Sequence, residues 1–111
     1  MQKISIEALA RQQLEAAIGS TNGRAADTVY GGHEKVLRQT VMAMTAGTRL
    51  SEHLNPGDAT VFVIQGCVNL RAGTESWQGK PGDLLIVPPG LHSLDAEEDS
   101  TFLFTVAKHR D

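Results

Sequence analysis

The chain has 111 residues and a mass of 11.9 kDa, and its ten Lys and Arg against thirteen Asp and Glu give a formal net charge of −3. A chain of this length folds as one domain. Because nucleic-acid-binding proteins usually carry a basic surface, the sequence pI of about 5.7 argues against a nucleic-acid partner. The apolar runs are too short to span a membrane, no signal peptide is recognisable, and the single Cys67 has no partner for an internal disulfide. We therefore expect a cytoplasmic domain that contacts neither nucleic acid nor membrane.

The N-terminal residues have the pattern of a short helix. Ser5 is a candidate N-cap, Glu7 suits the positive end of the helix dipole, and apolar residues recur at helical spacing as far as Ile18. Gly19 is a typical helix stop. Residues 19–27 are rich in turn formers and predict a flexible link. We therefore expect an N-terminal helix and linker over residues 1–27 and the main domain over residues 28–111.

From residue 28 onward, short runs of Val, Thr, Leu and Phe alternate with Gly, Pro, Asn and Asp. The pattern predicts strands near residues 28–32, 36–46, 49–54, 59–65, 67–72, 75–78, 83–87, 91–95 and 101–108. Turn signals recur roughly every eight to twelve residues, and no helical pattern separates the strands. This spacing is typical of an all-β antiparallel sandwich or barrel and argues against an alternating α/β fold.

Two of the predicted strands carry apolar residues on both faces. Val41 and Met42 face opposite sides of one strand, and Val61 and Phe62 face opposite sides of another. A sheet that is apolar on both faces needs a cover on each. The interior of the domain covers one face, and either the N-terminal helix or a second copy of the chain covers the other.

Residues 47–66, GTRLSEHLNPGDATVFVIQG, and residues 82–92, GDLLIVPPGLH, resemble the two conserved motifs of the cupin superfamily. The first motif is Gly, five residues, His-x-His, three or four residues, Glu, six residues and Gly. The second is Gly, five residues, Pro-x-Gly, two residues, His, three residues and Asn. The matching positions are Gly47, His53 and Gly66 in the first motif and Gly82, Pro88 and Gly90 in the second. His92 comes one residue early, and Ala96 stands four residues after it, where the pattern has Asn. The resemblance covers about residues 33–108 and is to the small single-domain bacterial cupins of the cupin-2 type.

The resemblance implies a cupin jelly-roll β-barrel of two antiparallel sheets with a short N-terminal helix. It also implies a homodimer, because small cupins commonly associate sheet to sheet. In metal-binding cupins, the two His and the Glu of the first motif and the His of the second hold a divalent ion such as Fe, Mn, Ni or Zn. In this sequence the four positions are occupied by His53, Asn55, Ala59 and His92.

Two of these four positions depart from the metal-binding pattern. His53 and His92 remain as candidate metal ligands, whereas Asn is a weak donor for transition metals and Ala cannot coordinate. Glu52 and Asp58 are each one residue off the inward-facing register, so they point away from the interior unless a bulge re-aims them. The sequence therefore does not identify a third protein ligand.

Without a metal, the same positions predict a small-molecule pocket. His53, Asn55, Val61 and His92 would line it, giving a mostly apolar surface with a few converging polar groups. A His can act there as an acid, a base or a donor to an anion. Arg38 and the residue after it face opposite sides of their strand, so one of the two can reach a ligand.

These residues favour a protein that binds or senses a small molecule in an internal pocket. The alternative is a divalent-metal-dependent cupin enzyme, a dioxygenase or isomerase acting on a small organic substrate. A third hypothesis is an interaction module whose outer sheet binds another protein, which requires a large exposed apolar patch.

Overall fold

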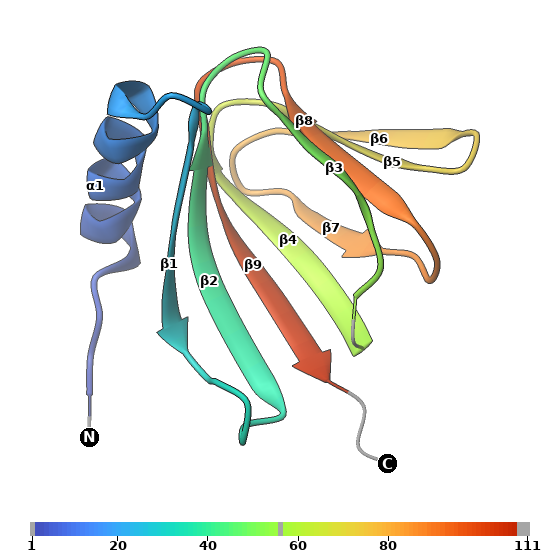
Figure 1. The fold of residues 1–111 in the computed structure, drawn as a ribbon, viewed down its shortest axis with the longest axis horizontal. Coiled ribbons are helices and arrows are strands. Elements are labelled where there is room, and N and C mark those ends of the chain that lie inside the picture. The colour runs from blue at the N-terminus through green and yellow to red at the C-terminus, as the bar shows by residue number, and fades with distance from the viewer. Residues whose placement is uncertain (1, 56, 109–111) are drawn as a thin grey trace.

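A computed structural model describes residues 2–55 and 57–108 (Figure 1). Over these residues the chain forms one helix and nine strands. In chain order they are α1 (Ile6–Gly19), β1 (Arg24–Tyr30), β2 (Leu37–Met44), β3 (Arg49–His53), β4 (Gly57–Gln65), β5 (Val68–Ala72), β6 (Glu75–Gly79), β7 (Leu84–Val87), β8 (His92–Ala96) and β9 (Ser100–Lys108). No helix in this described part of the chain combines the length and the apolar character needed to cross a membrane.

The helix α1 begins and ends where the sequence predicts. The Ser5 hydroxyl caps its first turn by accepting a hydrogen bond from the Ala8 amide at 3.2 Å. Glu7 lies in the same turn, where the helix dipole favours a carboxylate. At the other end, the backbone amide and the hydroxyl of Ser20 both donate to the Ala17 carbonyl. Each end of the helix therefore has a capping hydrogen bond.

The segment predicted as a flexible link, residues 19–27, is instead a tight turn followed by the first part of β1. The Arg24 amide donates to Ser20 Oγ and to Asn22 Oδ1, each at 3.2 Å, and these bonds hold the turn in place. The prediction was wrong here because β1 opens with Arg, Ala and Ala, which lack the branched side chains typical of strands.

The strands form the two antiparallel sheets of a jelly roll, as the resemblance to the cupins implies. One sheet has the order β1-β2-β9-β4-β7 and the other has the order β3-β8-β5-β6. All strand pairings within them are antiparallel. In the described residues no strand pairing joins the two sheets, so the barrel is not closed (Figure 1).

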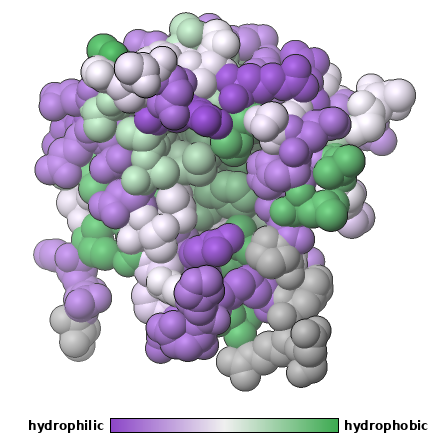
Figure 2. Space-filling model, in the orientation of Figure 1, coloured by the Kyte–Doolittle hydropathy of each residue, from purple (hydrophilic) through white to green (hydrophobic). Residues whose placement is uncertain are grey.

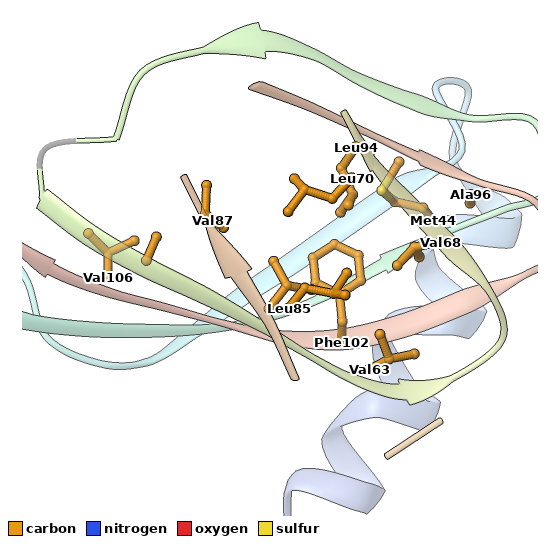
Figure 3. Close-up of a cluster of buried hydrophobic side chains, with 12 residues drawn as sticks. Met44, Val63, Val68, Leu70, Leu85, Val87, Leu94, Ala96, Phe102 and Val106 are labelled. Carbon is orange, nitrogen blue, oxygen red and sulfur yellow. The ribbon is translucent and has the colours of Figure 1, made fainter. Parts of the chain in front are cut away.

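The hydrophobic core lies between the facing surfaces of the two sheets (Figure 3). Alternate residues of β4 point into it, and Ala59, Val61 and Val63 are all buried, as the strand register predicts. Phe102 of β9 and Leu70 of β5 meet them from the two sheets. Met42, Leu50 and Phe104 are partly buried and pack against this core.

The helix α1 covers only part of the outer face of the five-stranded sheet. It packs over β1, β2 and β9, where the outward-facing Val41 and Ala43 are completely buried (Figure 1). Beyond the helix, three outward-facing apolar side chains of β4 and β7 stay exposed: Phe62 at 40%, Leu84 at 55% and Ile86 at 67%. We call these three residues the β4–β7 outer face.

Candidate functional site

An irregularity in β3 brings His53 to the interior of the molecule. Leu50 of β3 pairs with Leu94 of β8, and His53 pairs with His92. Two residues of β3 therefore lie opposite a single residue of β8, which is the arrangement of a β-bulge. Because of the extra residue, Leu50 and His53 both face inward although they are three positions apart. The bulge thus decides which side chain of β3 reaches the space between the sheets.

His53 and His92 form a close pair of imidazoles. Their ring centroids are 4.3 Å apart and their planes are tilted by 57°. His53 Nδ1 lies 2.9 Å from the Ser51 carbonyl oxygen. Since a carbonyl oxygen can only accept, Nδ1 carries a proton in this hydrogen bond. His53 is therefore oriented by its own strand, and in the Nδ1–H tautomer Nε2 is the acceptor nitrogen.

His92 is the more deeply placed member of the pair. Only 2% of its surface is exposed, and its Nδ1 is buried with no hydrogen-bond partner among the described residues. Burial lowers the pKa of His92, and the neighbouring His53 lowers it further, while the Gly90 backbone acts in the opposite direction. His92 is therefore a neutral imidazole near pH 7.

A cavity of about 350 Å³ lies beside this pair, between the two sheets. Its volume is within the range of roughly 300–1,000 Å³ that is usual for small-molecule sites. Met42, Leu50, Phe104 and Val106 supply apolar surface to it. Figure 2 shows a hollow with apolar side chains at its base and polar side chains around it.

The predicted pocket residues fall at three different places. His53, the last residue of β3, and Asn55, in the segment that follows β3, line the cavity. His92 stands behind His53, in ring contact with it but outside the cavity lining. Val61 lies in the hydrophobic core, away from the lining. The two histidines are thus brought together, and only one of them meets the cavity directly.

The structure adds Arg38 to the site. Arg38 lies on the inner face of β2 and lines the cavity, opposite the β3 wall that carries His53. Thr40 follows on the same face, and its hydroxyl lies 3.2 Å from the hydroxyl of Thr28 on β1. The next residue, Gln39, points outward and donates to Thr105 Oγ1 at 3.3 Å. The sequence left open which of these two residues faces a ligand, and the structure places Arg38 at the cavity.

The donor set does not fit a firmly held metal ion. In residues 2–55 and 57–108 no group of three or more His, Cys, Asp or Glu side chains is close enough to bind one. Ala59 is in the core, and Glu52 and Asp58 are exposed, as their register predicts. His33 is exposed in the β1–β2 connection, and His109 lies outside the described residues. The described residues therefore offer two imidazoles and no third ligand.

The outer face of the four-stranded sheet carries a polar network that is separate from the cavity. The Glu97 carboxylate accepts hydrogen bonds from Asn69 at 2.7 Å, from Gln78 at 3.0 Å and from the Cys67 thiol at 3.3 Å. These bonds, first of all that from Asn69, lower the pKa of Glu97, whereas burial and the nearby carboxylates raise the pKa of Cys67. Cys67 is therefore a protonated structural thiol and not a nucleophile.

Comparisons with known proteins agree on the fold. No protein-family model and no curated protein sequence matches the chain. Among solved structures, a conserved protein of unknown function from Streptococcus pyogenes matches with a TM-score of 0.74 and 25% identity, over 83% of this chain and 80% of that one. A cupin superfamily protein from Desulfitobacterium hafniense matches with a TM-score of 0.74 and 16% identity, over 82% and 83%. KdgF from Halomonas sp. matches with a TM-score of 0.68 and 22% identity, over 84% and 86%. The chain therefore has the fold of a small single-domain cupin.

Proposed function

We propose that this cupin-fold chain binds or senses a small organic molecule in the cavity between its two sheets. The observation that carries the proposal is the composition of the cavity wall. An apolar base formed by Met42, Leu50 and Phe104 is combined with the polar groups of His53 and Asn55. An apolar surface with a few converging polar groups is the usual lining of a small-molecule site.

The polar side chains of this wall differ in the hydrogen bonds that they can form with a ligand. His53 Nε2 can accept a hydrogen bond from a ligand, because Nδ1 is already held by the Ser51 carbonyl. The Asn55 amide offers both a donor and an acceptor, and it is two residues further along the chain. His92 supports the His53 ring from behind. A ligand with an apolar body and at least one polar group fits such a wall.

A ligand-observed NMR screen with a library of small organic fragments tests the proposal. Ala26 lines the cavity, so Ala26→Trp fills it, whereas Ala16→Trp adds the same side chain on the exposed side of α1. We expect fragments that bind the wild type and the Ala16→Trp variant and fail to bind Ala26→Trp. A library without hits on the wild type, or hits that survive Ala26→Trp, contradicts the proposal.

We also propose that the chain is a homodimer. Leu84, Ile86 and Phe62 form an exposed apolar surface that α1 does not reach. A second copy packed on the β4–β7 outer face covers this apolar surface, which supports a sheet-to-sheet dimer.

A further inference from the structure

We infer that the ligand of this cavity is an organic carboxylate, a small acid with one negative charge and an apolar body. The inference rests on the proposed function and adds the chemical class of the ligand. The juxtaposition behind it is that of Arg38 on β2 with His53 and Asn55 on the opposite wall.

The charge of the cavity lining is the first argument. Arg38 is the one formally charged side chain that lines the cavity in the described part of the chain, and no Asp or Glu lines it. The ion pairs of the described residues, Arg11 with Glu7 and Arg71 with Asp95, do not involve Arg38. Within residues 2–55 and 57–108 the Arg38 guanidinium therefore has no ion-pair partner, and a cation so placed at a cavity wall favours an anionic ligand.

The shape of the donor set is the second argument. The planar fork of the Arg38 guanidinium matches the two oxygens of a carboxylate. Next to it on the same wall, the hydroxyl groups of Thr28 and Thr40 can donate to an anion. A single formal cation matches one negative charge, which favours a monocarboxylate over a doubly charged phosphate ester.

The apolar part of the lining is the third argument. Val106 is paired with Arg38, and Phe104 and Met42 follow further along the inner face of the same sheet. These side chains cannot solvate a charged or hydroxylated group, so the part of the ligand that lies over them gains more if it is apolar. The carboxylate then lies at Arg38, and the apolar body extends over Phe104 toward Leu50.

The test uses 3-phenylpropionate and its uncharged amide as probes, with dissociation constants from NMR titrations of the 15N-labelled full chain. Arg38→Gln removes the proposed cation, and Arg11→Gln removes a cation from the exposed side of α1 as the matched control. We expect the wild type and Arg11→Gln to bind the acid about tenfold to a hundredfold more tightly than Arg38→Gln does, as for a lost hydrogen-bonded ion pair. The amide should bind all three proteins with similar, weak affinity.

Two further outcomes separate this inference from the proposed function. Acid and amide binding that are equal in the wild type and both lost in Ala26→Trp would overturn the carboxylate assignment while leaving the cavity as a binding site. Acid binding that persists in Ala26→Trp would place the acid elsewhere and contradict both. No acid binding at millimolar concentration would also overturn the carboxylate assignment. A folded Arg38→Gln spectrum, with unchanged peaks outside the cavity, keeps loss of binding distinct from loss of structure.

Discussion

The buried imidazole of His92 couples the stability of the fold to pH. In the native state its pKa lies below the ordinary value, because burial and His53 disfavour the charged form. In the unfolded chain the same ring takes up a proton below a pH of about 6.5. As pH falls through that value the unfolded state binds a proton that the native state does not, so the free energy of unfolding decreases. Above about pH 7 this contribution is constant, since both states are neutral.

Replacing the imidazole of His92 tests whether this residue makes the stability of the fold depend on pH. We expect His92→Phe to decrease the dependence of the unfolding free energy on pH between about 7 and 5, measured by urea denaturation. His33→Gln is the control, because it removes an exposed histidine, and its pH dependence should remain that of the wild type. A slope in His92→Phe as steep as in the wild type would show that another group is responsible.

The pair of His53 and His92 also gives a prediction about metals. In the described part of the chain no carboxylate joins the two imidazoles, and a metal ion held by two imidazoles alone has water in most of its coordination sphere and is bound weakly. We expect elemental analysis of untagged protein, purified without a chelator or a nickel column, to give less than about a tenth of an equivalent of Fe, Mn, Ni or Zn. A near-stoichiometric metal that is lost in the His53→Ala, His92→Ala double variant would establish the metal-dependent alternative.

At the scale of the element, the bulge of β3 gives the inward direction of His53. Deleting Glu52 removes the additional residue of the bulge, so that His53 follows Ser51 directly and remains opposite His92 in a regular ladder. We therefore expect this deletion variant to keep NMR contacts between the two imidazole rings. Deleting Ser51 together with Glu52 is the comparison, because it shifts the strand by one residue and turns His53 outward.

The NMR contacts between the imidazole rings of His53 and His92 test the role of the bulge in the two deletion variants. Loss of the contacts after the single deletion, or their persistence after the double deletion, would mean that the bulge does not determine the direction of His53. Circular dichroism of both variants shows whether the sheets are retained.

The sequence allowed the strands and the inward face of β4 to be predicted, because alternation along a strand is a local property. It did not allow the bulge of β3 to be predicted, since a bulge depends on how many residues of one strand face those of another. The direction of Arg38 stayed open for another reason: both faces of β2 are apolar, with Met42 on the face of Arg38 and Val41 on the opposite face. Because α1 covers the face of Val41, the face of Arg38 is the one that lines the cavity.

At the scale of the whole molecule, the two outer surfaces differ in chemistry. The outer face of the four-stranded sheet carries polar pairs such as Arg71 with Asp95, at 2.8 Å, and Arg49 with Ser93, at 3.2 Å. The β4–β7 outer face presents Phe62, Leu84 and Ile86 to solvent. Apolar exposure of this kind favours association, whereas the polar sheet favours contact with water.

Light scattering at micromolar concentration measures the association. We expect the wild type to have the mass of two chains and the Leu84→Lys, Ile86→Lys double variant to have the mass of one, because both lysines would have to be buried at the interface. Leu91→Lys changes an exposed leucine of the β7–β8 connection that lines a separate hollow with Trp77, and it should leave the dimer intact. A monomeric wild type would contradict the proposed dimer.

The proposed ligand site and the proposed dimer interface lie on opposite faces of the five-stranded sheet. The cavity is lined from inner-face positions such as Arg38 and Phe104, whereas the outer face of β4 and β7 is on the other side of the same sheet. Two copies joined through that outer face would each keep a complete cavity with no residue from the other. Saturation of one would leave the affinity of the other unchanged, so the titration curve of the dimer would have a Hill coefficient of about one.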